Sequence, residues 1–569
     1  MNLSFARRSR ELVSVFCVFA GALISLPTMI LPAQGAERIQ FFFGPFEPTI
    51  YVKDLETFAK TGEVTDQLKP VASRFNDEQL ANLRVGLNAQ YELNPIPVAQ
   101  FTYSTLGENL LGKLGQVVQT DNFLNGMKGI RAALILAAAN EEQGGLTALN
   151  VMRHFPSQTI QIDFSLAREI ATENVQIFRR RDHVIAEIKQ FARSQSVGGD
   201  TLIVEEDPRQ AGDYTWQVET ISFQTPGRLD SSLADLYLPD VPLEQVNAPI
   251  EDLSDRDISD RDIPVVVISH GVASTRNTLA YMAEHLASHG YAVVSIEHTE
   301  TSAENFSRFL WGRGSAPGGQ ELLLRPRDIT AVLDLLIAQQ TDAQQANNHS
   351  ALSDLNLESV GVLGQSLGGY TVLAAGGATI DRTFLAEACQ SSLAERPTLN
   401  LSLLTQCTLL ELPADTSMPV ADERVAAVVA LNPLTSSIFG MSGLQKIKIP
   451  VMMMAGSDDY VAPALPEQIE PFDWLTTEHK KLVVMDKGTH FSFLDRNAQS
   501  VLPFSEQLTG PDPMAAREPT RAMSLAFFDQ HLQQQAEAER FLTQTYLESF
   551  PTEPFGFSVV DSLPPTSAR

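Results

Sequence analysis

Residues 364–369 read Gly-Gln-Ser-Leu-Gly-Gly, and this stretch decides which fold the chain adopts. A β-prone apolar run at 359–363 precedes it, and small residues typical of a helix begin near Leu367. A serine on a tight turn between a strand and a helix stands clear of the sheet. Glycines two positions before and after it let the neighbouring backbone approach closely. The pattern therefore predicts a nucleophile elbow with Ser366 as the nucleophile; the alternative is a tight turn with a structural role only.

The sequence on both sides of the elbow predicts an α/β fold. Between about residues 213 and 545, short apolar runs without polar alternation are separated by helical patterns. Strands of this kind are buried on both faces, as in a mostly parallel sheet flanked by helices. The predicted strands lie at 265–268, 292–296, 360–363, 425–431, 451–454 and 482–485. Two antiparallel strands are expected before them, at 214–223 and 232–238.

A serine hydroxyl needs a general base to become a nucleophile, and histidine is the usual one. The histidines that follow Ser366 are His479, His490 and His531. His479 lies at a solvated helix end and His531 lies inside an amphipathic helix, whereas His490 lies in a loop after the last predicted parallel strand. A loop in that position can reach over the elbow, so we predict that His490 is the base.

An acid that orients the base is expected at a strand end between the serine and the histidine. Asp458 and Asp459 both follow the predicted strand at 451–455. Asp459 has a Gly-x-x-Asp spacing with a proline four residues later, whereas Asp458 is suited to capping the turn. We predict Asp459 as the acid, with Asp458 as the alternative.

Two backbone N–H groups are expected to receive the negative charge that develops on a substrate carbonyl oxygen. One is that of Leu367, directly after the nucleophile. The other is that of Val272, in the Ser-His-Gly-Val loop at 269–272 after a predicted strand. His270 in this loop is interpreted as a structural hydrogen-bonding residue. No His/Asp cluster has the spacing of metal ligands, so metal catalysis is not expected.

The N-terminus has the pattern of a secretory signal peptide. Three arginines within the first ten residues are followed by an apolar run from about 12 to 32 and by small residues at 33–35. We predict that residues 1–35 are a cleaved signal and that the protein is exported to the periplasm or the extracellular space. The alternative is an uncleaved helix that anchors the protein in a membrane, because about 20 apolar residues can span a bilayer.

Cysteine usage agrees with export. Cys17 lies in the predicted signal, and Cys389 and Cys407 remain as an even pair. In an oxidising compartment such a pair favours a disulfide. The alternative is two buried free thiols.

The charge balance bears on partners. The chain has 41 Lys and Arg residues against 69 Asp and Glu residues, a net charge of -28. An acidic protein offers little positive field for a phosphate backbone, so nucleic acid is not an expected partner. Peripheral or N-terminal membrane association stays open, and the sequence does not predict the oligomeric state.

The composition changes along the chain and suggests four parts. Residues 1–35 are followed by a mainly helical N-terminal domain at 36–205, a catalytic domain at 206–549 and a proline-rich tail at 550–569. A leucine-rich insertion at 378–423 is interpreted as a lid with an acyl-binding surface. Its alternative is an insertion that simply packs onto the domain.

Several motifs resemble the platelet-activating-factor acetylhydrolase-like and dienelactone-hydrolase-like branches of the α/β-hydrolases. They are Ser-His-Gly-Val at 269–272, Leu-Ala-Ser-His-Gly-Tyr-Ala-Val-Val at 286–294, Glu-His at 297–298 and Gln-Ser-Leu-Gly-Gly at 365–369. The resemblance covers about residues 213–495 and implies an α/β-hydrolase fold and hydrolysis of carboxylic esters without a cofactor. Residues 37–165 resemble an uncharacterised domain found ahead of such bacterial hydrolases.

The chain departs from the acetylhydrolases at one site position. They carry the acid after the strand that follows the nucleophile, where this chain has Asn432. An asparagine cannot replace a charged acid, so the resemblance to the dienelactone hydrolases implies that Asp459 takes the role. The departure argues against a phospholipid substrate more than against the chemistry.

These observations predict an exported carboxylesterase or lipase-like serine hydrolase that forms an acyl-enzyme. A serine peptidase on the same fold is one alternative. A hydrolase-fold binding protein without activity is the other.

Overall fold

The computed structural model describes residues 35–42, 47–140, 145–196, 207–241, 263–345, 351–394, 400–495 and 510–565. Residues 1–34 of the predicted signal peptide lie outside the described residues. The described chain forms two compact units. The first runs up to Pro95 and continues at Leu114–Phe164, and the second comprises Ile96–Lys113 and the chain from Ser165 onward. The division therefore does not follow the predicted boundary at 205/206.

The first unit contains a small sheet and several helices. Its four-stranded sheet has the order β2-β1-β6-β4 in the described residues, and β1 pairs in parallel with β6. The strands are β1 (Arg38–Phe42), β2 (Thr49–Tyr51), β4 (Val118–Gln119) and β6 (Thr159–Asp163), beside the pair β3 (Gln90–Tyr91) and β5 (Leu146–Thr147). The helices are α2 (Val52–Thr61), α3 (Lys69–Ala72), α4 (Asp77–Asn88), α7 (Met127–Ala139) and α8 (Ala148–His154). This unit has its own apolar core, which includes Ile39, Phe58 and Phe155.

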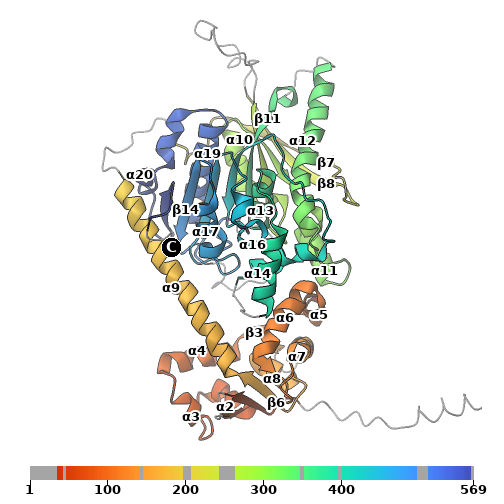
Figure 1. Cartoon of the computed structure of the whole chain (residues 1–569), viewed down its shortest axis with the longest axis vertical. Coiled ribbons are helices and arrows are strands. Elements are labelled where there is room, and N and C mark those ends of the chain that lie inside the picture. The colour runs from red at the N-terminus through yellow and green to blue at the C-terminus, as the bar shows by residue number, and fades with distance from the viewer. Residues whose placement is uncertain are drawn as a thin grey trace, which may run out of the picture. The chain divides into compact units, whose positions relative to one another are not determined.

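The second unit is built on a twisted sheet, which is nine-stranded in the described residues (Figure 1). The order is β15-β14-β13-β12-β11-β9-β10-β8-β7, and the six strands from β14 to β10 run parallel. Antiparallel strands β7, β8 and β15 extend the two edges. The bounds are β7 (Trp216–Phe223), β8 (Ser232–Pro239), β9 (Ile263–Ser269), β10 (Ala292–Ile296), β11 (Leu355–Gln365), β12 (Val425–Leu431), β13 (Val451–Gly456), β14 (Lys480–Asp486) and β15 (Gly556–Val560). The predicted α/β class and its mostly parallel sheet are confirmed.

Helices cover both faces of this sheet. Alternate residues of β9 belong to different apolar clusters, with Val265 and Val267 on one face and Val266 and Ile268 on the other. The first face packs against α12, α13 and α16, and the second against α10 and α19. This two-sided burial explains why the strands lack polar alternation.

The helices of the second unit are α5 (Pro95–Tyr103), α6 (Thr105–Val117), α9 (Phe164–Gln195), α10 (Ala280–Ser288), α11 (Ala303–Leu310), α12 (Glu321–Gln345), α13 (Leu367–Ala375), α14 (Arg382–Ala394), α15 (Ser402–Cys407), α16 (Ser436–Leu444), α17 (Glu470–Trp474), α19 (Met514–His531) and α20 (Gln544–Leu547). Three of these helices cross the boundary between the units: α5 and α9 each begin one residue inside the first unit, and the last four residues of α6 belong to the first unit. Among the described residues, none of the helices is both long and apolar enough to cross a membrane.

The predicted C-terminal tail contains part of the fold. Strand β15 pairs antiparallel with β14, with Val560 opposite Leu482. Val559 and Val560 are buried in the two apolar clusters. The last described segment therefore completes one edge of the sheet.

The insertion at 378–423 packs onto the second unit and is closed by a disulfide. Cys389 and Cys407 are bonded, as predicted, and both are buried, so the alternative of two free thiols is wrong. Leu385 and Leu409 belong to the main apolar cluster. Whether the insertion acts as a lid stays a prediction.

A buried carboxylate fixes the insertion to the sheet. Glu467 accepts hydrogen bonds from Asn400 Nδ2 at 2.5 Å and from Gln406 Nε2 at 3.1 Å, both in the insertion. It also accepts bonds from the backbone N–H groups of Thr435 and Ser436, at 2.7 and 3.0 Å, after β12. Because so many donors converge on one fully buried carboxylate, its charge is compensated by hydrogen bonds.

We predict that Glu467→Gln lowers the free energy of unfolding by about 3 kcal/mol, because an amide NH₂ group would face backbone donors in a buried site. Urea unfolding measures the change. The matched control is Glu470→Gln, which removes a partly exposed carboxylate paired with Arg180 and should cost less than about 1 kcal/mol. Equal losses in the two variants would contradict the role given to Glu467.

Candidate active site

Ser366 occupies a strained turn between β11 and α13. Its backbone has φ 58° and ψ −120°, a region that non-glycine residues rarely adopt. The glycines around it are required by close contacts. A Cβ at Gly364 would lie 2.2 Å from the carbonyl oxygen of Gly368, and one at Gly368 would lie 2.0 Å from that of Ser269. The motif thus folds into a tight strand-to-helix turn that presents the Ser366 side chain.

The structure brings Ser366, His490 and Asp459 together. Ser366 Oγ lies 2.8 Å from His490 Nε2, and His490 Nδ1 lies 2.6 Å from Asp459 Oδ2. The three residues follow β11, β14 and β13, and they are 8%, 5% and 1% exposed. Parallel strands end at the same edge of a sheet, which is why residues so distant in sequence meet there.

Asp459, the predicted acid, is held by its own turn. Asp459 Oδ1 accepts hydrogen bonds from the N–H groups of Val461 and Ala462, each at 2.8 Å. One carboxylate oxygen is thereby fixed, and the other is directed at the imidazole. Asp458, the alternative acid, points elsewhere and lies 3.5 Å from the Arg181 guanidinium.

Two residues that the sequence did not assign to the site hold these loops in place. Asn432, in the left-handed region with φ 43°, donates from Nδ2 to the carbonyl oxygen of Thr489 and accepts from the Gly456 N–H. It therefore connects the loop of His490 to the end of β13. Gln365 Nε2 donates to the carbonyl oxygen of His490 itself, at 2.9 Å.

Helix α9 contacts the loop of the acid. Phe178 packs edge-on against Tyr460, and the Arg181 guanidinium lies over the Phe178 ring. The Arg181 side chain is only 12% exposed and pairs with Asp458. A strand-and-loop pattern gives no signal for this contact, because α9 is almost 300 residues earlier in the sequence.

The loop after β9 has a fixed hydrogen-bond pattern. The backbone N–H of His298 donates to His270 Nε2 at 3.0 Å, so the ring proton resides on Nδ1 and is donated to the Gly271 carbonyl oxygen at 2.6 Å. Burial lowers the pKa of His270 well below its ordinary value, and the ring is neutral. In a planar trans peptide the C=O and N–H groups point in opposite directions. The N–H of Val272 therefore points away from the His270 ring.

A second Ser-His-Asp constellation lies beneath this loop. Ser269 Oγ is 2.8 Å from His298 Nε2, and His298 Nδ1 is 2.6 Å from Asp328 Oδ2. All three side chains are fully buried, so no substrate reaches them. Burial lowers the pKa of His298 to about 3. Although burial alone would raise the pKa of Asp328, hydrogen bonds from His298 and Arg228 hold it below its ordinary value.

Buried arginines complete this polar network. Arg228 binds Glu321 with two hydrogen bonds, at 2.9 and 3.1 Å, and binds Asp328 with two more at 2.7 Å. Arg325 donates to Thr371 Oγ1, to Thr301 Oγ1 and to the carbonyl oxygen of His270. Burial lowers the pKa of Arg325 to about 9, which still leaves it charged at neutral pH. Two arginines therefore balance two carboxylates behind the loop.

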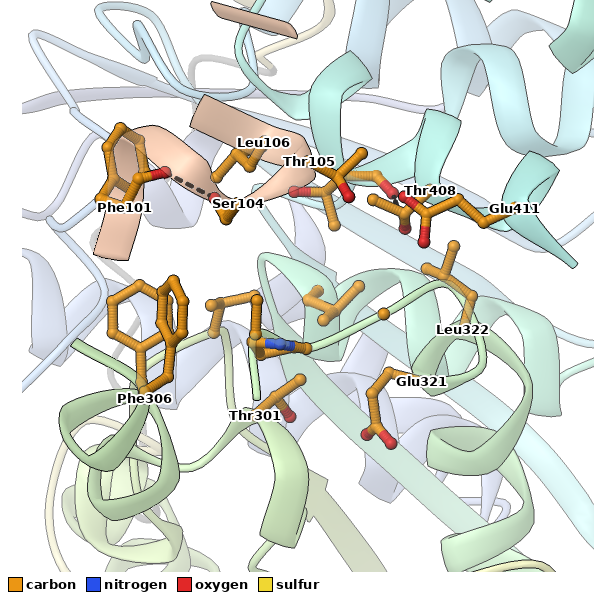
Figure 2. Close-up of a pocket in the computed structure, with 17 residues that line it drawn as sticks. Phe101, Ser104, Thr105, Leu106, Thr301, Phe306, Glu321, Leu322, Thr408 and Glu411 are labelled. Atoms are coloured by element: carbon orange, nitrogen blue, oxygen red, sulfur yellow. Dashed lines mark hydrogen bonds between the residues drawn. The ribbon is translucent and has the colours of Figure 1, made fainter. Parts of the chain in front are cut away.

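A cavity of about 130 Å³ lies beside these elements (Figure 2). Val272 and Leu367, whose N–H groups are the predicted oxyanion donors, both line it. Leu367 is the first residue of α13, and the first N–H groups of a helix have no partner within the helix. The other lining residues are Phe101, Ser104, Thr105, Leu106, Thr301, Phe306, Phe309, Ala316, Pro317, Gly318, Glu321, Leu322, Thr405, Thr408 and Glu411, and all belong to the second unit.

The described residues contain no group of three His, Cys, Asp or Glu side chains placed to hold a metal ion.

Two family matches bear on the class of protein. Residues 35–163 match the family described as "Alpha/beta hydrolase of unknown function (DUF1400)". Residues 240–310 match "Platelet-activating factor acetylhydrolase, isoform II". No curated protein matches the chain. Together with the mostly parallel sheet and the elbow, the matches show an α/β hydrolase.

Within this class, the chain is similar to the platelet-activating factor acetylhydrolases over the segment that contains β9, the loop of Val272 and β10. The similarity indicates a hydrolase of the lipase or esterase type. The first match spans most of the first unit and also the helices α5 and α6, which line the cavity in part.

We predict that the free energy of unfolding falls as the pH falls from 6.5 toward 4, in part because of His298. In this window the unfolded chain binds a proton at His298, with an ordinary pKa of 6.5, whereas the folded protein does not until about pH 3. One such group contributes about 1.4 kcal/mol per pH unit. His298→Asn retains a donor toward Asp328 without a titratable ring. Urea unfolding at pH 7, 6, 5 and 4.5 should give a flatter curve for this variant, and parallel curves would contradict the prediction.

Proposed function

We propose that this protein hydrolyses carboxylic esters through Ser366, His490 and Asp459. Ser366 Oγ bonds to the ester carbonyl carbon while its proton passes to His490 Nε2. The ester C–O bond then breaks, and His490 returns that proton to the leaving alcohol oxygen. Water attacks the acyl-Ser366 in the same way and releases the carboxylic acid, which restores the serine.

The observation that carries this proposal is the hydrogen-bonded chain from Ser366 Oγ through His490 to Asp459, next to a cavity. The elbow places Ser366 directly before Leu367, which lines the cavity, and the imidazole is within proton-transfer distance. The carboxylate holds the imidazole proton on Nδ1. The similarity to acetylhydrolases supports an ester as the bond that is cleaved.

The charge that develops on the carbonyl oxygen is assigned to the N–H groups of Val272 and Leu367. The bond from His270 to the Gly271 carbonyl oxygen supports this role, because it fixes the peptide unit that carries the Val272 N–H. The position of Leu367 at the start of α13 adds the favourable end of the helix dipole.

We further propose that the enzyme is exported to the periplasm or the extracellular space. The predicted signal at 1–35 and the buried Cys389–Cys407 disulfide support this location, since disulfides persist in oxidising compartments. The proposed substrate is a small-molecule or lipid ester, and the proposed hydrolysis uses no cofactor.

The first experiment labels the purified protein with a fluorophosphonate probe. We expect modification of Ser366, found by peptide mass spectrometry, and loss of labelling in Ser366→Ala. Turnover of p-nitrophenyl butyrate should fall by on the order of 10⁴-fold in this variant. The matched control is Ser231→Ala, an exposed serine in the same unit, which should behave as wild type. Cleavage of p-nitroanilides but not of esters would point to a peptidase instead.

Unlabelled wild type without turnover of any ester would argue for a binding protein. Labelling at Ser269 instead of Ser366 would contradict the assignment of the two constellations.

A second prediction concerns His270. His270→Gln places its amide near the former Nε2 and loses the donor to Gly271, whereas His270→Asn keeps a donor near Nδ1. We expect kcat to fall about 100-fold in the glutamine variant with KM nearly unchanged, because the oxyanion donor acts in the transition state. The asparagine variant should retain most of the activity. An equal fall in kcat in the glutamine and asparagine variants, or a rise in KM with kcat unchanged, would argue against this role.

A further inference from the structure

The connection between α5 and α6 forms one wall of the cavity. Phe101, Ser104, Thr105 and Leu106 line it, opposite Thr301, Phe306, Glu321 and Leu322 (Figure 2). We refer to residues 101–106 as the α5–α6 corner. It precedes Ser366 by about 260 residues, and nothing in its own sequence indicates a site.

The α5–α6 corner is a rigid turn. Ser104 Oγ donates to the Phe101 carbonyl oxygen at 2.7 Å and accepts from the Gly107 N–H at 3.2 Å, so it caps α6. A Cβ at Gly107 would lie 2.0 Å from the carbonyl oxygen of Phe101, which leaves room only for glycine. The two helices are therefore held at a fixed angle where they meet the cavity.

Phe101 also packs next to the loop that carries a predicted oxyanion donor. Its ring lies against a small apolar cluster of Ala273, Phe306, Phe309 and Leu310. Ala273 directly follows Val272, and its N–H donates to the Thr301 carbonyl oxygen at 2.9 Å. The α5–α6 corner thus contacts the same wall from which the Val272 N–H would bind the carbonyl oxygen of an ester.

The size and charge of the cavity limit what fits. An engineered apolar cavity of about 150 Å³ admits benzene, so a cavity of about 130 Å³ suits a group of about six heavy atoms. None of the lining residues that the structure describes is Lys, Arg or His. Both ionisable lining residues are acidic: Glu321 is paired with Arg228, and Glu411 is exposed. An anionic group would find no countercharge on these walls.

We propose that the α5–α6 corner determines specificity, with Phe101 as the wall that limits the length of a compact, uncharged acyl group. This inference rests on the proposed ester hydrolysis. The acyl group stays on Ser366 through both steps, whereas the alcohol leaves after the first, so the cavity suits the acyl group and an open side suits the alcohol. A segment from the N-terminal family match would then act in substrate selection.

The test compares Phe101→Ala with wild type on p-nitrophenyl esters of two to twelve acyl carbons. Removing the ring lengthens the cavity, so kcat/KM for the decanoyl ester relative to the butanoyl ester should rise about tenfold or more. The gain should come mainly from a lower KM for the decanoyl ester, and Phe101→Ala should still be labelled at Ser366 by the fluorophosphonate probe. Phe101→Leu, which retains part of the volume, should give a smaller shift in the same direction.

The matched control is Tyr103→Ala, an aromatic residue of the same helix that is 64% exposed and does not line the cavity. Its acyl profile should equal that of wild type. A second series of butanoyl esters with alcohols of increasing length should give the same profile in wild type and Phe101→Ala. A shift in the alcohol series instead of the acyl series would overturn the acyl assignment.

The inference fails if an active, fluorophosphonate-reactive Phe101→Ala keeps the wild-type acyl profile. The proposed function fails separately, if wild type itself neither reacts with the probe nor cleaves any ester of either series.

Discussion

The site depends on one backbone constraint, the positive φ of Ser366. A non-glycine residue in this region costs of order 1–3 kcal/mol, and it persists only where the surroundings fix it. Here they do: the Ser366 N–H donates to the Leu431 carbonyl oxygen at 2.9 Å, and Gly364 and Gly368 allow the strand and helix to approach within contact distance of each other. Strain at the serine is therefore supported by packing that is spread over the whole second unit.

The parallel sheet sets the positions of the residues that surround Ser366. Strands β9, β11, β12, β13 and β14 end at one edge, and each contributes a residue to the site or to its support. Asn432 follows β12, and its side-chain bonds to Thr489 and Gly456 connect the loops of the base and the acid. A carboxylate at that position would lack the amide donor for the Thr489 carbonyl oxygen. The departure from the acetylhydrolase pattern therefore has a structural counterpart: the Asn432 amide connects two loops, and Asp459, the proposed acid, follows β13.

Local patterns were enough to predict the sheet, the elbow and the residues that meet at it, because each lies directly after a recognisable strand. The disulfide followed from the cysteine count. What the sequence did not predict depends on contacts between distant segments. Arg181 follows Arg179 and Arg180 in α9, and local sequence does not distinguish such a run from a solvated helix face, yet Arg181 packs against the loop of Asp459. Phe101 lies in a helix without any polar motif. The predicted tail supplies β15, whose Gly556–Val560 pattern is too short to separate an edge strand from a loop. The periodicity of a segment indicates whether it forms a helix or a strand, but not which distant segment it packs against.

The two Ser-His-Asp constellations show why residue types and distances alone do not define an active site. Ser269, His298 and Asp328 have the same two distances as Ser366, His490 and Asp459, which are 2.8 Å from serine to histidine and 2.6 Å from histidine to aspartate. The two trios differ in how deeply their side chains are buried and in the charged groups around them. The first trio is fully buried and joined to Arg228 and Arg325, so its histidine has its pKa lowered to about 3 and its hydroxyl proton is committed to that ring. Since all three side chains are fully buried, a substrate has no access to this trio. It can fix the loop above it, whereas Ser366, the proposed nucleophile, directly precedes Leu367, which lines the cavity.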